Sequence, residues 1–231
     1  MSRRYRYSAT QEEVKDIGRI TARLLQSFGI LCCLVGGVAC SALGVSRINN
    51  DVDMAVMTDE DPESIKRRLV LADSRFYLVN ARNPTASYKV LWFRVQDSFI
   101  DRSCKVDILR RGTLNIPNIP RDKIRNIGGL PVAHILVVLF LKLQAWESHG
   151  AAIEQRYRQK EPIDRRDISV LLDIAVAGGQ HVEKESWLPQ SFVDEAKRRT
   201  KAYCASYGAD TTKEQWREIG LMLKSPRTLR Y

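Results

Sequence analysis

The stretch "LVGGVACSALGVSRINNDVDMAV", residues 34–56, decides the fold of this chain. A continuous apolar run stops at Gly36 and Gly37, and a second apolar run carries two carboxylates, Asp51 and Asp53, one residue apart. A short apolar run ended by glycines is typical of a buried strand that turns directly into a helix. Side chains at i and i+2 of a strand share a face, so the two carboxylates project together while the alternate residues face the core.

Two carboxylates this close repel each other unless a cation lies between them, and oxygen ligands suit a hard divalent ion such as Mg²⁺. A third carboxylate, Asp107, stands in the strand-like run "CKVDIL" between apolar residues that face the other way. Three acids on neighbouring strands indicate a two-metal site for phosphoryl transfer. The plainer alternative is that Asp51 ends a turn and Asp53 lies at a sheet edge, and an isolated D-x-D motif does not separate the two.

The glycine pair has two readings as well. Because Gly36 and Gly37 lack a Cβ, the amides at the start of the following helix can approach an anion closely, and the helix dipole adds to the attraction. A simple strand-to-helix turn is the alternative. The stretch is neither a Walker motif nor a dinucleotide fingerprint.

The rest of the chain predicts an α+β fold: a small mixed β-sheet core flanked by helices and followed by a C-terminal helical subdomain. Thr10 and Glu13 are placed like a capping box before a helix over 10–28. A helix over 61–73, two strands within 75–95 and a strand over 104–112 follow. The prolines and glycines of 112–131 predict a loop that crosses to the helical part, with boundaries of 1–116 and 117–231. From Pro131 onward the pattern is helical, over 131–148, 162–177, 190–206 and 211–223.

Composition narrows the class of protein. The chain has 231 residues and a formal charge of +10, which favours acidic partners such as nucleotides or RNA. Its five cysteines have no zinc-ligand spacing, so reduced thiols are expected. The longest apolar run, "ILVVLFL", is too short to span a bilayer, so we expect no membrane partner and a soluble protein of the cytoplasm, with the nucleus left open. The sequence does not predict an oligomeric state.

These motifs carry a resemblance. A Gly-Gly after an apolar strand, a D-x-D further along and a distant strand Asp resemble the DNA polymerase β-type nucleotidyltransferase superfamily. Within it, "GGVACSALGVSRINNDVD" resembles the minimal and abortive-infection-toxin-like branch, and "SYKVLWFRV" with "KVDIL" resembles uncharacterised fungal members. The resemblance covers residues 31–112, and the helices more loosely. The chain departs from it at Gly37, where many relatives have Ser; this removes a hydroxyl ligand and keeps the amide.

The resemblance implies that residues 1–116 form a nucleotidyltransferase core. In it Asp51 and Asp53 would bind two Mg²⁺ ions, for which Mn²⁺ can substitute, and Asp107 would complete the metal site and activate the attacking hydroxyl. Gly36 and Gly37 would hold the triphosphate of an NTP.

Two cations extend the implied nucleotide site. Arg47, just before the metal strand, would touch phosphate, or is a solvated loop arginine. Lys142 in "FLKLQAW" would face the nucleotide, or forms an ion pair with Asp167 between the subdomains.

The implied reaction moves a nucleoside monophosphate from an NTP to a hydroxyl acceptor. The basic charge favours RNA, including tRNA, over a protein side chain or a small molecule such as an aminoglycoside. A basic rim of seven residues beside the third carboxylate is a candidate RNA-facing surface: Arg102, Lys105, Arg110, Arg111, Arg121, Lys123 and Arg125. The alternative function is an inactive nucleotide- or RNA-binding module on the same fold.

Overall fold

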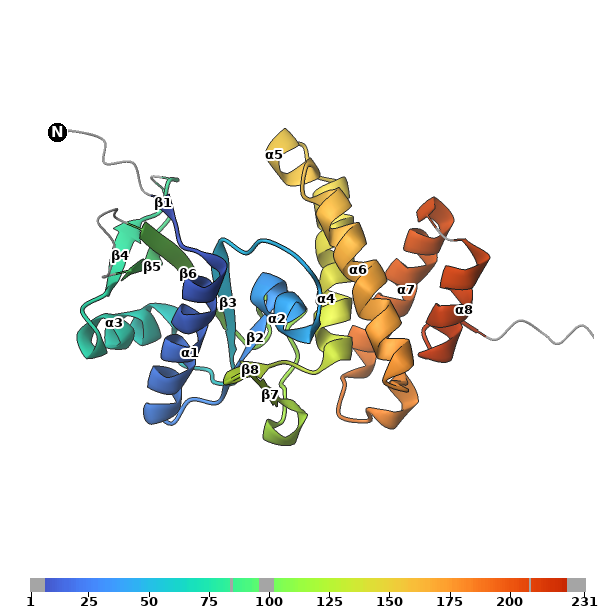
Figure 1. Ribbon diagram of the computed structural model, residues 1–231, viewed down its shortest axis with the longest axis horizontal. Helices are drawn as coiled ribbons and strands as arrows, with labels where there is room; N and C mark the ends of the chain where they lie inside the picture. The colour runs from blue at the N-terminus through green and yellow to red at the C-terminus, as the bar shows by residue number, and fades with distance from the viewer. Residues whose placement is uncertain (1–6, 84, 96–101, 208, 224–231) are drawn as a thin grey trace, which may run out of the picture. The chain divides into compact units, whose positions relative to one another are not determined.

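A computed structural model describes residues 7–83, 85–95, 102–207 and 209–223. The chain divides into two compact units, Met1–His134 and Ile135–Tyr231. The first unit holds the β-sheet and three α-helices, and the second is helical (Figure 1). The predicted α+β class, with a mixed sheet flanked by helices, is confirmed.

The sheet of the first unit is mixed. Among the described residues it contains eight strands: β1 (Tyr7–Ser8), β2 (Cys32–Val35), β3 (Asp51–Val56), β4 (Phe76–Asn80), β5 (Lys89–Val95), β6 (Arg102–Arg110), β7 (Arg125–Ile127) and β8 (Leu130–Val132). Their order is β4-β5-β6-β3-β2-β8-β7, and β1 pairs with β6 outside this path. The pairs β3–β6, β2–β8 and β1–β6 are parallel, and the other neighbours are antiparallel.

Three helices cover the sheet: α1 (Gln11–Ser27), α2 (Gly36–Leu43) and α3 (Pro62–Ala72). The predicted capping box is present, because the Thr10 side chain accepts from the Glu13 amide and the Glu13 side chain accepts from the Thr10 amide. The apolar face of α1 buries Val14, Ile17 and Leu25 almost completely against β2, β3 and β8. This burial fixes the helix to the centre of the sheet, since removal of apolar surface from water is the main stabilising term.

The pairing of the central strands brings the glycine turn to the carboxylates. Since β2 and β3 are antiparallel, the C-terminal end of β2 lies beside the N-terminal end of β3, and Val35 is the partner of Asp53. Residue 36 begins α2 directly after this pair. On the other side of β3, the parallel strand β6 places Asp107 opposite Asp53. The features that are separated in the sequence therefore meet at one end of β3.

The segment between the sheet and the helices differs from the prediction. Residues 112–131 were expected to be a crossing loop and a helix was expected from Pro131, but the structure has two 3₁₀ turns (Thr113–Asn115 and Arg121–Lys123) and the hairpin β7–β8 here. Gly128 and Gly129 make the hairpin turn with φ of 58° and 80°, which a side chain would disfavour. Because β8 pairs with β2 at Leu34 and Val132, the first unit extends to His134, beyond the expected boundary after residue 116.

The second unit consists of α4 (Ile135–Gly150), α5 (Gln155–Arg158), α6 (Glu161–Ala177), α7 (Gln190–Tyr207) and α8 (Asp210–Glu218), with a 3₁₀ turn at Val182–Lys184. The apolar start of α4, residues 135–140, is buried on all sides, and α4 packs against α6 and α7. The predicted ranges correspond to α4, α6, α7 and α8, but α4 begins at Ile135 and α8 ends at Glu218, five residues before the expected end. Among the described residues, no helix is both long and apolar enough to cross a membrane.

Candidate active site

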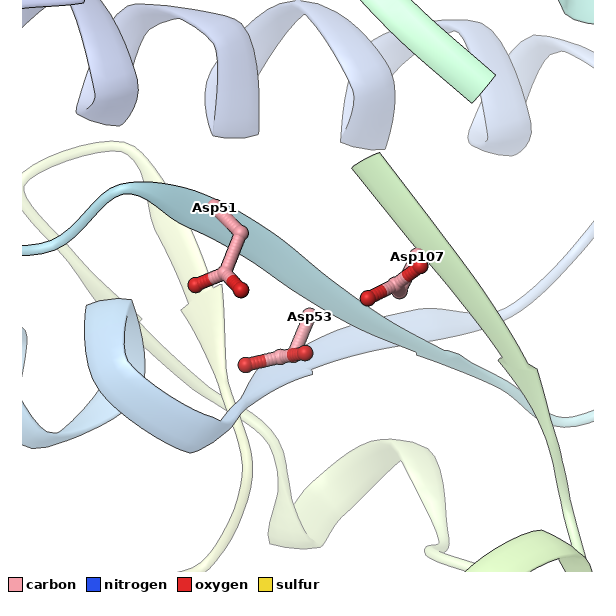
Figure 2. A group of neighbouring side chains, drawn as sticks. All are labelled: Asp51, Asp53 and Asp107. Atoms are coloured by element: carbon pink, nitrogen blue, oxygen red, sulfur yellow. The ribbon is translucent and has the colours of Figure 1, made fainter. Parts of the chain in front are cut away.

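Three carboxylates meet on one face of the sheet. Asp51 and Asp53 project from β3 and Asp107 from β6, and Figure 2 shows all three in one small region. One ligand atom from each lies within 4.8 Å of the others. Val52 and Met54 alternate with the first two and are fully buried, as the period of two in a strand requires. The predicted acidic triad is therefore assembled, and its members are half-buried.

The triad has a lysine beside it. Lys105 Nζ donates to Asp107 Oδ2 at 2.5 Å. Burial alone would lower the pKa of Lys105, but this hydrogen bond and the charges of Asp107, Asp51 and Asp53 raise it on balance. The same negative region acts on a neighbour, since burial and then the three carboxylates raise the pKa of the Cys104 thiol to about 12. Negative charge is thus concentrated at this point of the sheet.

The glycine turn lies against the triad. Gly36 has φ of 60°, and an added Cβ would overlap Asp53 and come within 2.7 Å of its Cγ. An added Cβ on Gly37 would lie 2.6 Å from Asn49 Oδ1 and 3.2 Å from Arg47 Cζ. Both positions therefore exclude a side chain for reasons within the protein. Val35, the N-cap of α2, provides no side-chain cap, so the first amides of the helix are not capped by it.

The donor set fits a divalent cation. Three carboxylates offer only oxygen ligands, the type that Mg²⁺ and Mn²⁺ prefer, and none of the three is sealed from solvent. A cation would also relieve the repulsion among charges at this spacing. The structure identifies the triad as the group of His, Cys, Asp and Glu side chains among the described residues that is close enough to hold an ion.

The two predicted nucleotide-binding cations lie in different units. Arg47 is half-buried in the loop beside Gly37. Lys142 is buried in the helical unit, where its Nζ lies 3.0 Å from Asp164 Oδ1 and 2.9 Å from Asp167 Oδ2. The ion pair with Asp167 exists, but it joins α4 and α6 of one unit and does not connect the two subdomains. A role of either cation towards a nucleotide stays a prediction.

The basic rim is less uniform than its composition indicates. Arg102 is bound to Glu13, Lys105 to Asp107, and Arg111 to Asp59 through an ion pair at the surface. Arg121 is exposed at the start of a 3₁₀ turn, and Arg125 is exposed on β7. Part of the rim thus serves contacts within the unit.

Two residues that the sequence alone did not single out for the site lie in it. Lys105 was counted only as a rim charge, although its position two residues before Asp107 on one strand places it on the same face. Asn49 is 3% exposed beside Gly37, and the sequence offered only its place in "INND" before the strand.

No protein-family model and no curated protein sequence matches the chain. Two solved structures resemble it along most of its length. An antigenic nucleotidyltransferase-like protein from Paracoccidioides brasiliensis aligns with a TM-score of 0.67 at 14% identity, covering 95% of this chain and 97% of that one. The chain has a nucleotidyltransferase-like fold. JHP933 from Helicobacter pylori aligns with a TM-score of 0.50 at 16% identity, covering 93% of this chain and 91% of that one. This is the fold that the sequence resemblance implies, and the superfamily and its branch stay predictions.

Proposed function

We propose that this protein is a metal-dependent nucleotidyltransferase that moves a nucleoside monophosphate from an NTP to a hydroxyl acceptor. The observation that carries the proposal is the assembly of Asp51, Asp53 and Asp107 within 4.8 Å, on two adjacent parallel strands, beside the glycine turn of α2. The nucleotidyltransferase-like fold supports it. Neither element alone would suffice, because acidic groups are common on protein surfaces and strand-to-helix turns are common in sheets.

Each residue has a role in the proposed reaction. Asp51, Asp53 and Asp107 would hold two Mg²⁺ ions, with Mn²⁺ as a substitute. Bound there, the ions would supply charge neutralisation for the attacking and leaving oxygens. Asp107 would accept the proton of the acceptor hydroxyl, and for this its carboxylate would exchange its bond to Lys105 for one to the substrate. Pyrophosphate leaves as the nucleotidyl group is transferred.

The phosphates would bind at the start of α2. The amides after Gly36 and Gly37 are not capped by a side chain of the N-cap residue, and the helix dipole favours an anion there. Arg47 lies beside the same turn and would add a guanidinium to the phosphate contacts. Lys142 is proposed as a further nucleotide contact, and it would then have to serve both the nucleotide and its two aspartates.

The acceptor is proposed to be RNA, a class that includes tRNA. The formal charge of +10 supports a polyanion. The exposed rim residues Arg121 and Arg125 are available for phosphate contacts, whereas Arg102 is engaged with Glu13. A small-molecule or protein hydroxyl would replace RNA if binding proved insensitive to salt.

A non-catalytic nucleotide- or RNA-binding module is the second candidate. A module that only bound polyanions would gain affinity by losing negative charge from its binding face. This chain has three carboxylates there, which favours the enzyme.

The test combines binding and turnover. Thermal unfolding is measured with each NTP in the presence and absence of Mg²⁺, since a ligand at 100 times its Kd stabilises the folded state by about 2.7 kcal/mol. Each labelled NTP is then incubated with Mg²⁺ and a cell extract, and RNA and protein are separated on gels. We expect metal-dependent stabilisation by an NTP and label transferred to RNA. Stabilisation without any transfer would favour the binding module. If no NTP stabilised the protein and no label was transferred, both the enzyme and a nucleotide-binding module would be refuted.

A further inference from the structure

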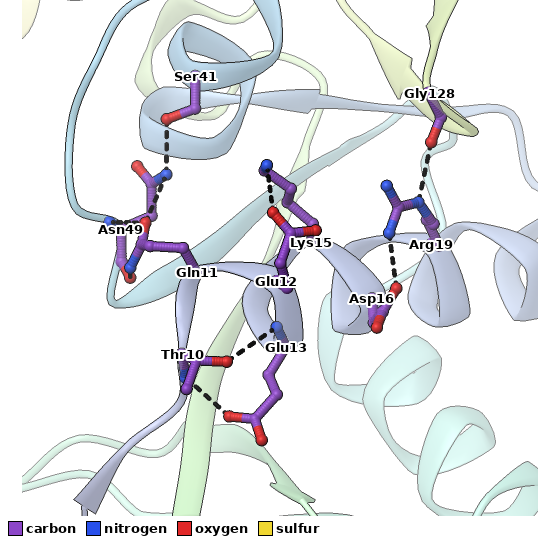
Figure 3. A network of polar contacts seen from close by, with 10 residues as sticks. All are labelled: Thr10, Gln11, Glu12, Glu13, Lys15, Asp16, Arg19, Ser41, Asn49 and Gly128. Carbon is purple, nitrogen blue, oxygen red and sulfur yellow. Dashed lines mark hydrogen bonds and ion pairs between the residues drawn. The ribbon is translucent and has the colours of Figure 1, made fainter.

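The loop that leads into the metal strand is held by a small network of amide and hydroxyl groups. Figure 3 shows Gln11 at the start of α1, Ser41 on α2 and Asn49 in the loop joined by hydrogen bonds. The Gln11 side chain binds both backbone groups of Asn49: Nε2 donates to the carbonyl at 3.0 Å, and Oε1 accepts from the amide at 2.7 Å. Asn49 Nδ2 donates to Ser41 Oγ at 2.7 Å and to Gln11 Oε1 at 3.3 Å.

These contacts determine which way the Asn49 amide points. Gln11 Oε1 must be the acceptor, because it faces the backbone N–H of Asn49. The side-chain atom of Asn49 nearest to Gln11 Oε1 must then be the donor Nδ2, since two acceptors facing each other would repel. Oδ1 therefore points the other way, towards Gly37, at the position 2.6 Å from where a Cβ of that residue would lie.

Asn49 Oδ1 is buried and has no hydrogen-bond partner among the described residues. An acceptor in this state is costly, and most buried polar groups avoid it. A small apolar residue at position 49 would remove the cost. The Oδ1 end of the amide therefore does not stabilise the fold. The Nδ2 end joins the loop to α1 and α2 beside the site.

We propose that Asn49 is a positioning residue: held by Gln11 and Ser41, it fixes the loop 44–50 against the glycine turn. This sets Arg47, and Asp51 two residues further on, for ligand binding. The effect of Asn49 on ligand binding rests on the proposed function. Its effect on the loop rests on geometry alone. It also gives Gly37 a second reason to be glycine. The space of its missing Cβ is filled by an amide that two hydrogen bonds hold in place.

The geometric part predicts a change of sign. In the natural protein, Gly37→Ala should lower the unfolding temperature, because its Cβ meets Asn49 Oδ1, which cannot retreat without breaking the bonds to Gln11 and Ser41. Arg47 contributes less to this clash, since its guanidinium is the far end of a flexible side chain. In an Asn49→Ala background the same substitution should raise the unfolding temperature, because alanine is the better helix former. Equal effects of Gly37→Ala in the two backgrounds would overturn the contact on which the inference stands.

The functional part is tested with Mn²⁺ alone, by calorimetry, and with hydrogen exchange of residues 45–50. Asn49→Ala should lower Mn²⁺ affinity by about 10- to 100-fold, the range for residues that orient metal ligands, and speed the exchange. Gln11→Ala is a milder variant that should act in the same direction. Asn50→Ala is the matched control, because Asn50 is the same residue type in the same loop with an exposed side chain. Unchanged affinity and exchange in Asn49→Ala would overturn the inference. A natural protein that bound no Mn²⁺ would instead refute the metal-dependent function, and the sign change with the exchange rates would still decide whether the network holds the loop.

Discussion

The two units of this protein treat buried charge in opposite ways. In the sheet unit, three carboxylates converge on one half-buried face that solvent and ions can reach. In the helical unit, Asp164 and Asp167 are 4% and 0% exposed, and Lys142 lies between them, with His149 Nδ1 bound to Asp164. The difference separates charges that a ligand can reach from charges that are paired inside the protein. A buried charge is costly once its partner is removed, whereas charge left accessible and close together is suited to an exchangeable cation.

The largest expected effect is on the sheet unit. Asp51→Asn or Asp53→Asn should lower nucleotidyl transfer by roughly 10³-fold or more, because several kcal/mol of charge stabilisation would be lost with the metal. Without metal the variants should unfold at the same temperature as the natural protein or higher, since a repulsive charge is removed. Asp16→Asn, which changes an exposed carboxylate of α1, is the control. Substantial turnover in either triad variant would refute the metal assignment.

The matching experiment in the helical unit should have the opposite effect on stability. Lys142→Met leaves two buried carboxylates without their lysine, and breaking a buried ion pair costs about 3–5 kcal/mol. Chemical denaturation measures the loss of stability, and hydrogen exchange in α4 and α6 locates it. Adding Asp167→Asn to Lys142→Met should recover part of it. If Lys142→Met folds with natural stability but loses NTP affinity, the comparison fails, and the lysine belongs to the nucleotide site.

A smaller effect is expected from surface charge. Reversing Arg121 and Arg125 to Glu should flatten the salt dependence of RNA binding by about 0.7 in the log–log slope for each lost contact with a single strand. NTP affinity should change little. Lys197→Glu with Lys201→Glu on α7 is the matched control in the helical unit. Filter-binding from low to moderate salt measures the slopes. Equal slopes for the natural protein, the rim variant and the α7 control would show that RNA does not bind at the rim.

The smallest expected effects are on the stability of the two units at acid pH. Burial raises the pKa of Glu13, but the hydrogen bonds with Arg102 and Thr10 outweigh it, so this pKa lies below its usual value. Hydrogen bonds from Arg198 and Arg199 lower the pKa of Glu147 in the same way. A lowered folded-state pKa stabilises above the unfolded-state pKa, and this contribution is lost as pH falls through the folded-state value. Glu13→Gln should therefore weaken the acid dependence of the sheet unit, and Glu147→Gln that of the helical unit. Unfolding curves from pH 7 to about pH 3, near the carboxyl pKa range, test both. A change in the other unit's curve would contradict the assignment.

The sequence predicted those parts of the fold that local pattern determines. The apolar runs predicted β2, β3 and the helices α4, α6 and α7 of the second unit, and the period of two placed Asp51 and Asp53 on one face. The hairpin β7–β8 was missed, because strands of three residues are too short to show a period.

The site was predicted less completely, for a different physical reason. The triad could be found because its residue type is unexpected in strands. Asn49 could not, because its partner Gln11 lies 38 residues away and is brought to it only by the packing of α1. Composition likewise counted Arg102 and Lys105 as available charge, although Glu13 and Asp107 bind them.

The buried cysteines of the two units allow the opening of each unit to be measured. Burial raises the pKa of Cys32 to about 12 and that of Cys33 still higher. It also raises the pKa of the Cys204 thiol on α7. The thiolate is the form that attacks a thiol-specific reagent, so each buried cysteine should react only when its surroundings open. Four of the five thiols lie in the sheet unit, and Cys204 lies in the helical one. The labelling rate of Cys204, compared with that of the other four by mass spectrometry, therefore reports how often each unit opens under native conditions, within one sample and without any substitution in the chain.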